Sequence, residues 1–220
     1  MRIVIFGAGE NGLQALVCLR RAGLVDVVGF LDGAPEKKGT QVAGLPVLGN
    51  LDEIPRLVSG AGVTGAVVAI GDNRHRARLT AAVRAAGLEV VSAIHPWALI
   101  ESPRRIGAGC IIEMGAAVHV DADVGEGVFI GGGAIVSHQS VIGDFCLIGG
   151  GAVFGGHVTI GPRTLVGVGA KLKPQIAIGA DSVIGVGAVV VKDVPDRVMV
   201  AGVPARVVRT LEPQVEPSTT

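Results

Sequence analysis

An apolar side chain recurs at every sixth position between residues 100 and 190, without a shift of frame. These sixteen positions are Ile100, Ile106, Ile112, Val118, Val124, Ile130, Val136, Ile142, Ile148, Phe154, Ile160, Val166, Leu172, Ile178, Ile184 and Val190. Positions i and i−2 of a strand point the same way, and the residue two before each apolar position is mostly small. Glycine, which tolerates the dihedral angles of tight corners, follows most of them. Repetition at a fixed period predicts a parallel β-helix.

This repeat resembles that of the hexapeptide acyltransferases. Their left-handed β-helix is triangular in section, with three hexads in each coil. On that resemblance the sixteen hexads make a little over five coils. At ~4.8 Å between stacked strands the prism is roughly 25 Å tall. Residues one coil apart then lie above one another, and the sequence can be read in columns.

Composition excludes several classes of partner. The 19 basic and 19 acidic residues balance, which gives no electrostatic footprint for nucleic acid or an anionic membrane. The apolar run at residues 1–6 is too short for a signal peptide or a membrane span. Cys110 and Cys146 fall in inward positions two coils apart, about 9–10 Å, too far for a disulfide. With Cys18 they are expected to be core residues of a cytoplasmic protein.

The N-terminal segment carries a nucleotide-binding pattern. Residues 2–6 predict a buried parallel strand, residues 7–12 (GAGENG) a turn, and the residues up to Gly23 a helix. A second strand over residues 27–31 ends at Asp32, twenty residues after Gly12. In such units a phosphate binds at the helix N-terminus and the carboxylate meets a ribose hydroxyl or another polar group.

The length of this segment limits what it can bind. Further strands are expected over residues 65–70 and 88–91 and a helix over 74–86, so only four or five short strands precede residue 100. A complete dinucleotide fold does not fit. We favour a half-Rossmann unit that binds a mononucleotide or nucleotide-sugar over an NAD-binding domain. The third interpretation is that the glycine-rich turn serves only tight packing and binds no ligand.

We therefore predict three segments: an α/β domain over residues 1–97, a left-handed β-helix over 98–193, and a C-terminal CoA-side segment over 194–220. Trp97 is expected to plug the junction between the small domain and the first coil, and His95 to be structural. Residues 201–206 (AGVPAR) resemble the closing motif of hexapeptide acyltransferases. The polar residues 212–220 are expected to be disordered.

A small nucleotide-type domain followed by a β-helix resembles one family in particular. This is the sialic acid O-acetyltransferase-like family, which includes the nucleotide-linked amino-sugar N-acetyltransferases of the bacillosamine and perosamine type. The matching segments are residues 7–12, 30–32, 70–73 with Arg76, 94–96, 137–138, 141–145 and 202–205. The resemblance implies acetyl-CoA as cosubstrate, a homotrimer, and an active site between neighbouring β-helices beneath a nucleotide-sugar held by the N-terminal domain.

The resemblance also implies roles for individual residues. His138 has the position of the catalytic base, and Gly156 that of a backbone contact to the acetyl group. The nucleotide-sugar would be bound by Gly7, Gly9, Asn11, Gly12, Asp32, Asp72 and Asn73. The coenzyme would be held by Gly156, Ala170, Gly202, Pro204 and Arg206.

The columns support this assignment of His138. None of His119, His138 and His157 shares a column with another, so no convergent metal site is expected. Gly156 falls directly above His138, which opens space beside the imidazole and bares a backbone N–H for an oxyanion. We expect His138 to take a proton from the acceptor as it attacks the thioester.

Three positions depart from the family. An acidic residue commonly follows the catalytic histidine, whereas here it is Gln139, which can orient the imidazole but not neutralise it. Asp121, one coil below Gln139, is the candidate substitute. Leu147 and Asn11 occupy positions where some members carry histidine.

Outward columns predict the oligomer interface. The column Ile111, Phe129, Leu147, Leu165, Val183 is apolar through five coils, and a second face carries Ala117, Ile135, Val153, Lys171 and Val189. An apolar stripe of this length usually marks a partner surface, and two unlike faces suit a closed ring.

We therefore expect an acetyl-CoA-dependent N-acetyltransferase acting on a nucleotide-linked 4-amino-4,6-dideoxy sugar, without a metal. The alternatives are O-acetylation of a sugar such as sialic acid, a non-catalytic nucleotide-sensing scaffold, and, as a weaker option, an NAD(P)-dependent oxidoreductase.

Overall fold

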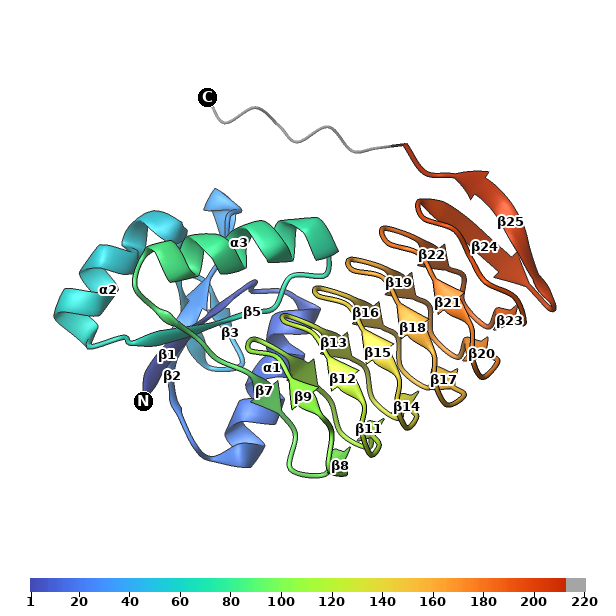
Figure 1. Cartoon of the computed structure of the whole chain (residues 1–220). Helices are drawn as coiled ribbons and strands as arrows, with labels where there is room; N and C mark the ends of the chain where they lie inside the picture. The colour runs from blue at the N-terminus through green and yellow to red at the C-terminus, as the bar shows by residue number, and fades with distance from the viewer. Residues whose placement is uncertain (213–220) are drawn as a thin grey trace.

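The computed structural model describes residues 1–212, and the predicted disordered tail falls almost wholly outside these residues. The chain forms an α/β domain beside a stack of triangular coils (Figure 1). Both parts agree with the predicted fold class.

The N-terminal domain is a six-stranded sheet with the order β3-β4-β2-β1-β5-β6, parallel except for the β3–β4 hairpin. Its strands are β1 (Arg2–Phe6), β2 (Asp26–Leu31), β3 (Gln41–Val42), β4 (Leu45–Gly49), β5 (Gly65–Val68) and β6 (Glu89–Val90). Its helices are α1 (Glu10–Ala22), α2 (Ile54–Ala61) and α3 (Asn73–Ala85), with 3₁₀ turns η1 (Pro35–Lys37) and η2 (Leu51–Glu53).

Alternation along β1 explains the layers of this domain. Ile3 and Ile5 pack with α1, whereas Val4 and Phe6 pack in the cluster that contains buried residues of α2 and α3. Successive side chains of a strand point to opposite faces, so a strand that is apolar throughout needs cover on both.

The β-helix has three faces of two-residue strands, each paired in parallel with the strand one coil away. Face 1 comprises β7 (Ala93–Ile94), β10 (Ile111–Ile112), β13 (Phe129–Ile130), β16 (Leu147–Ile148), β19 (Leu165–Val166) and β22 (Val183–Ile184). Face 2 comprises β8 (Leu99–Ile100), β11 (Ala117–Val118), β14 (Ile135–Val136), β17 (Val153–Phe154), β20 (Lys171–Leu172) and β23 (Val189–Val190). Face 3 comprises β9 (Arg105–Ile106), β12 (Asp123–Val124), β15 (Val141–Ile142), β18 (Thr159–Ile160) and β21 (Ala177–Ile178).

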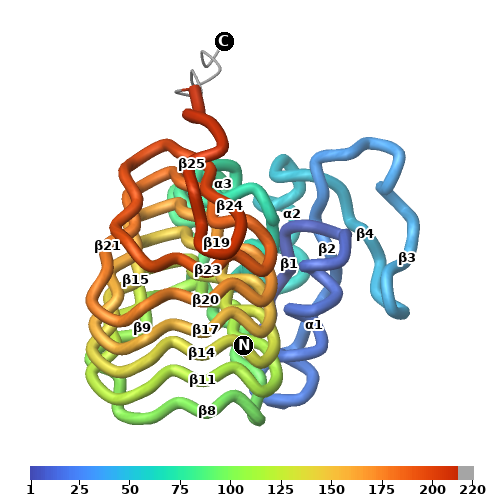
Figure 2. Tube along the Cα trace, turned by 90° about the vertical axis from the view of Figure 1, so that its right-hand side faces the viewer, coloured from blue at the N-terminus to red at the C-terminus, as the bar shows by residue number. Residues whose placement is uncertain are grey.

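The interior of the coils is filled by the second residue of each strand and by the small residue two before it, such as Ala134 and Val136. Face 1 continues into a hairpin, β24 (Val198–Gly202) and β25 (Ala205–Thr210), which closes the last coil (Figure 2). The first coil begins with β7, so its first strand lies upstream of residue 98.

The N-terminal domain covers the lower part of face 1. Ile111 and Phe129 are buried in the same cluster as Ile3 and Leu16, and Leu147 packs against that cluster. The prediction that this whole column contacts a partner chain is therefore wrong for Ile111 and Phe129, because the chain's own α/β domain covers them.

The predicted plug at Trp97 is also wrong, since the residue is 72 % exposed. At the junction, α1 packs against β7 instead. His95 is buried, and its Nδ1 accepts a hydrogen bond from the Trp97 amide at 3.0 Å, which fits a structural role.

A buried guanidinium joins the two parts. Arg76 on α3 is 1 % exposed and donates to the carbonyl oxygens of Gly127, Phe145 and Cys146 in the β-helix. It also donates to Ile70 O and Asn73 Oδ1. Burial lowers the pKa of Arg76 to about 10, so the group is still charged at neutral pH.

Candidate active site and nucleotide pocket

His138 lies at the corner between faces 2 and 3, in the turn from β14 to β15. Its side chain is exposed and lies against the buried Gly156 of the next coil. A Cβ on Gly156 would be 2.3 Å from His138 Cε1 and 2.5 Å from Nε2, so only glycine leaves room for this imidazole. Within residues 1–212 the Gly156 N–H donates no hydrogen bond. The corner therefore pairs a solvent-facing imidazole with a free amide donor.

The ring of His157 lies perpendicular to that of His138, with centroids 5.3 Å apart. Gln139 and Asp121 each adopt a positive φ, at 55° and 56°, and both are exposed. Among the described residues no hydrogen bond joins either side chain to His138. Within residues 1–212, no carboxylate therefore orients this imidazole.

The second predicted region is a pocket of about 580 Å³ in the α/β domain. It lies where β1, β2, β4 and β5 end, and the carboxyl ends of parallel strands are where such sheets bind ligands. Its lining residues are Phe6, Gly7, Leu31, Asp32, Gly33, Ala34, Asn50, Leu51, Asp52, Ile70, His75 and Leu79.

The glycine-rich turn is shaped by close packing. A Cβ on Gly12 would be 1.8 Å from Gly7 O, and Gly7 itself has a φ of +101°. Gly9 is the N-cap of α1 and provides no side-chain cap, which leaves first-turn amides available to an anion. The neighbouring Asn11 is half-buried and lies close to Gly71. A Cβ on Gly71 would be only 2.9 Å from Asn11 Nδ2.

Asp32 is held by the chain itself. Its Oδ2 accepts from the Ala8 amide (2.8 Å) and from Lys37 Nζ (2.7 Å), and its Oδ1 accepts from the Ala34 amide (3.0 Å). Burial opposes ionisation, but these hydrogen bonds outweigh it and hold the pKa of Asp32 below its ordinary value. Asp32 thus fixes the turn that shapes the pocket.

Sequence reasoning missed Asn50 and Asp52. Asn50 follows β4, which lies next to β2 in the sheet. A polar residue directly after a parallel strand lies at the carboxyl edge of the sheet, and this position could have identified Asn50 from the sequence. The side chain of Asn50 accepts from the Asp52 amide and donates to Asp52 Oδ2, both at 3.1 Å.

Asp72 and Asn73 lie at a different cleft of about 470 Å³. Asp72 caps α3 by accepting from the His75 amide at 2.6 Å. Asn73 donates to Arg163 O at 2.9 Å and so ties α3 to the β-helix. Both residues have structural partners in this chain.

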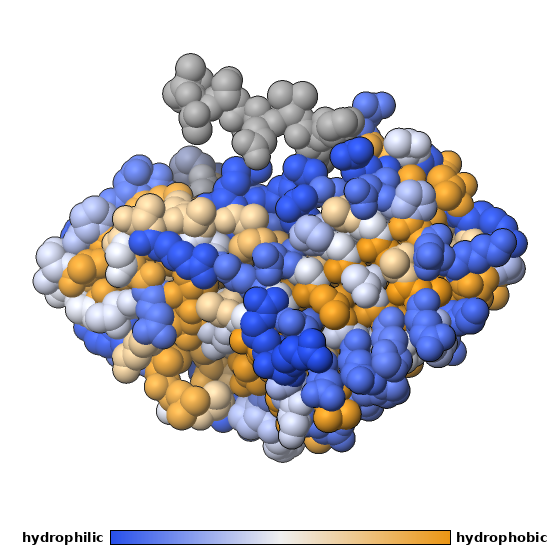
Figure 3. Space-filling view, in the orientation of Figure 1, coloured by the Kyte–Doolittle hydropathy of each residue, from blue (hydrophilic) through white to orange (hydrophobic). Residues whose placement is uncertain are grey.

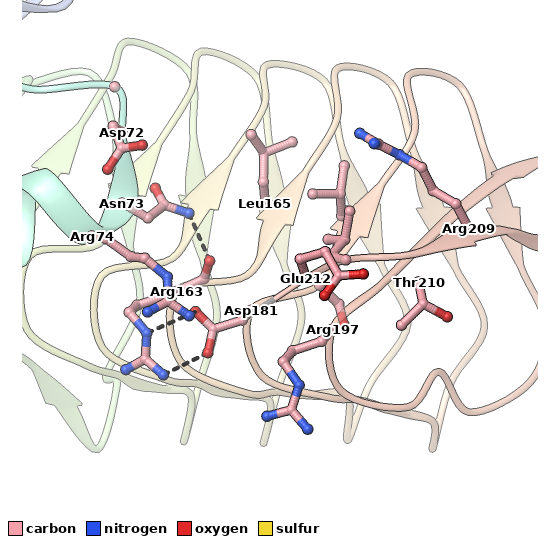
Figure 4. Close-up of a pocket in the computed structure, with 14 residues that line it drawn as sticks. Asp72, Asn73, Arg74, Arg163, Leu165, Asp181, Arg197, Arg209, Thr210 and Glu212 are labelled. Atoms are coloured by element: carbon pink, nitrogen blue, oxygen red, sulfur yellow. Dashed lines mark hydrogen bonds and ion pairs between the residues drawn. The ribbon is translucent and has the colours of Figure 1, made fainter. Parts of the chain in front are cut away.

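An ion-pair network spans the same cleft (Figure 4). Asp181 pairs with Arg163 through both carboxylate oxygens and with Arg74 of α3. The hydrogen bonds from Arg163 hold the pKa of Asp181 below its ordinary value.

The predicted coenzyme residues lie in two places. Ala170 is fully buried in the core of the β-helix, so its side chain is not available to a ligand. Gly202 and Pro204 are exposed in the β24–β25 hairpin. Arg206 lines a pocket of about 240 Å³ together with Lys192, which belongs to the corner between faces 2 and 3 in the last coil.

The single chain does not bring His138 to the nucleotide pocket. The α/β domain docks on face 1 and on the corner between faces 3 and 1, where Arg76 binds. His138 lies at the corner between faces 2 and 3, which is opposite face 1, and it does not line the pocket.

The residues 1–212 contain no group of three or more His, Cys, Asp or Glu side chains that could hold a metal ion. Burial raises the pKa of Cys110 and Cys146 to about 12 and that of Cys18 to about 11. These thiols stay protonated and are poor nucleophiles. In the same part of the chain no helix has the length and apolarity needed to cross a bilayer.

Comparisons with known proteins agree with this architecture. The PglD N-terminal domain family matches residues 2–83, and the bacterial transferase hexapeptide (six repeats) family matches residues 121–156. A crystal structure of PerB from Caulobacter crescentus in complex with CoA and GDP-perosamine is 37 % identical, with a TM-score of 0.89. The match covers 94 % of this chain and 97 % of that one.

The chain belongs to the hexapeptide-repeat sugar acetyltransferases with a PglD-type N-terminal domain. A variant of perosamine N-acetyltransferase from the same organism is 36 % identical over 94 % of this chain and 96 % of that one, with a TM-score of 0.89. The acetyltransferase domain of PglB from Neisseria gonorrhoeae, with acetyl coenzyme A, is 29 % identical over 94 % and 98 %, with a TM-score of 0.86. A comparison with curated protein sequences gave no match.

Membership in this family confirms the predicted resemblance, the β-helix fold and the class of enzyme, an acyltransferase.

Proposed function

We propose that this acyltransferase transfers the acetyl group of acetyl-CoA to the amine of a nucleotide-linked 4-amino-4,6-dideoxy sugar. The observation that carries the proposal is the corner formed by His138 and Gly156, where an exposed imidazole lies beside a free backbone N–H. The similar structures that contain CoA with GDP-perosamine, or acetyl coenzyme A, support the choice of substrates.

The reaction is a direct transfer. The sugar nitrogen attacks the thioester carbonyl while His138 accepts the amine proton. The Gly156 N–H stabilises the oxyanion, which collapses as the C–S bond breaks and CoA thiolate leaves. No covalent enzyme intermediate is required, and the three cysteines are buried.

We infer that the coenzyme lies along this corner. The corner rises from His138 through Gly156 to Lys192, three coils above at ~14 Å, and Arg206 lines the same pocket as Lys192. Cationic side chains at the far end suit the phosphates of CoA, and the thioester end would then reach His138.

A homotrimer would complete the site. His138 lies at the corner opposite face 1, whereas the nucleotide pocket belongs to the domain that docks on face 1. A neighbouring copy would therefore place its nucleotide domain beside this His138. The exposed or half-buried apolar residues of face 2, Ile135, Val153 and Val189, supply a contact surface. We place the reaction in the cytoplasm, where acetyl-CoA and nucleotide-sugars are found.

The test is a thiol-release assay with acetyl-CoA and a panel of UDP- and GDP-linked 4-amino-4,6-dideoxy sugars. One donor–acceptor pair should release CoA rapidly, and His138→Ala should lower turnover by ~10²–10⁴. His119→Ala, one coil below, is the matched control and should retain activity. Release only with hydroxyl acceptors would show O-acetylation instead, and failure to bind acetyl-CoA would refute the enzymatic proposal.

A further inference from the structure

We propose that the pocket at the carboxyl edge of the sheet selects a guanine nucleotide, and that Asp52 reads the base. This inference rests on the proposed function, because it names the nucleotide that carries the amino sugar.

The lining of the pocket suits a nucleoside. The large apolar side chains that line it are Phe6, Leu31, Leu51, Ile70 and Leu79, and His75 adds a ring on which a base can stack. Within the described part of the chain no lysine or arginine lines it, and its charged groups are Asp32 and Asp52. A pocket with carboxylates and apolar walls favours a ligand that presents N–H or O–H donors.

The two carboxylates differ in how many hydrogen bonds they already accept within the chain. Asp32 already accepts three hydrogen bonds from Ala8, Ala34 and Lys37, which engage both of its oxygens. Asp52 accepts one, from Asn50 Nδ2 to Oδ2 at 3.1 Å, and no hydrogen bond to its Oδ1 occurs within residues 1–212. Asp52 is therefore the carboxylate free to bind a ligand.

Asn50 also prepares Asp52 for this task. Its side chain bonds both the backbone amide and the carboxylate of Asp52, which holds the carboxylate beside the pocket before a ligand arrives. Preorganisation of this kind lowers the entropy cost of binding.

Nucleobase chemistry identifies the ligand. Guanine presents two adjacent donors, N1–H and the 2-amino group, which can meet the two oxygens of one carboxylate. Uracil has a single N3–H between two carbonyl oxygens, which a carboxylate repels. Cytosine and adenine place an unprotonated ring nitrogen beside their amino group. Since hydrogen bonds to a charged acceptor are about twice as strong as neutral ones, Asp52 should favour guanine over the other three bases.

The test is calorimetric titration of the full-length protein with GDP, UDP, CDP and ADP. GDP should bind about 10- to 100-fold more tightly than UDP, the discrimination expected of one good bidentate pair. Asp52→Asn, which replaces one acceptor oxygen by a donor, should weaken GDP binding by a similar factor and leave UDP binding within about twofold. Asp26→Asn, the same change at an exposed ion pair on β2, is the control.

Tighter binding of another nucleotide, unchanged GDP binding by Asp52→Asn, or no binding of any of the four would overturn the guanine assignment. The acetyl-transfer assay separates the two proposals. Acetylation of UDP-linked sugars at least as fast as GDP-linked ones would refute the role of Asp52 and leave the reaction in place. GDP binding that depends on Asp52, without acetyl transfer to any amino sugar, would uphold the base site and refute the catalytic proposal.

Discussion

The imidazole of His138 and the backbone of Gly156 are in such close contact that a methyl group on residue 156 would be 2.3 Å from His138 Cε1. The glycine is thus required by the position of the histidine. The corner that pairs them is also the place where the chain offers a base and an amide donor side by side.

Gly156→Ala should therefore displace the imidazole and lower turnover to about the level of His138→Ala, a loss of ~10²–10⁴. Gly60→Ala is the control, because a Cβ there meets nothing within 4 Å. Steady-state kinetics with circular dichroism would separate a displaced base from a failure to fold. Wild-type turnover in Gly156→Ala would show that this contact does not position the base.

Arg76→Met should lower the free energy of unfolding by about 3 kcal/mol or more, because it leaves the Gly127 and Phe145 carbonyl oxygens without their donor. Arg78→Met, on an exposed position of the same helix, should change stability by less than about 0.5 kcal/mol. Urea denaturation measures both. Equal midpoints for the two variants would mean that Arg76 contributes nothing to domain docking.

Asp181→Asn should destabilise the protein by about 1 kcal/mol at pH 7, since it breaks the ion pairs with Arg163 and Arg74. The folded-state pKa of Asp181 lies below the ordinary 3.8. Its stabilisation is therefore complete above pH ~4 and is lost as the pH falls through the folded-state pKa. Urea unfolding at pH 7 and pH 3 should show a wild-type advantage that shrinks in acid; a constant advantage would contradict the ionic origin.

Val153→Glu should dissociate the proposed trimer, because it places a carboxylate on face 2, where Ile135 and Val189 occupy the same column. Val141→Glu is the control. Val141 is similarly exposed, at 41 % against 36 % for Val153, but belongs to face 3, which carries the Arg105–Asp123 ion pair. Figure 3 shows hydrophilic residues mixed with apolar ones on that side.

Size exclusion with light scattering should give a smaller species for Val153→Glu alone. Dissociation by Val141→Glu, with an intact trimer in Val153→Glu, would move the interface to face 3.

Much of the architecture could be predicted because its determinants are local and repeated. Each hexad specifies its own strand and corner. The sequence of residues 100–190 therefore predicts the β-helix, its columns and the contact between His138 and Gly156. The glycine-rich turn and the apolar residues of β1 likewise predict a nucleotide-binding type of domain, because each feature depends on only a few adjacent residues.

The surfaces between distant segments were decided only by the tertiary structure. Ile111 and Phe129 carry the same outward apolar pattern as residues above them, and only the docking of α1 shows that the chain covers them itself. Trp97 is exposed because α1 and β7 already pack at the junction.

The same holds for the carboxylates of the nucleotide pocket. The motif points to Asp32, yet the Ala34 amide, Lys37 Nζ and the Ala8 amide occupy its oxygens, and Ala8 reaches it only because β1 and β2 pair in the sheet. Asp52 in η2 keeps one oxygen that accepts no hydrogen bond within residues 1–212. Local interactions that repeat along the chain can be read from the sequence. Which hydrogen bonds form between distant segments depends on how those segments pack in the folded chain.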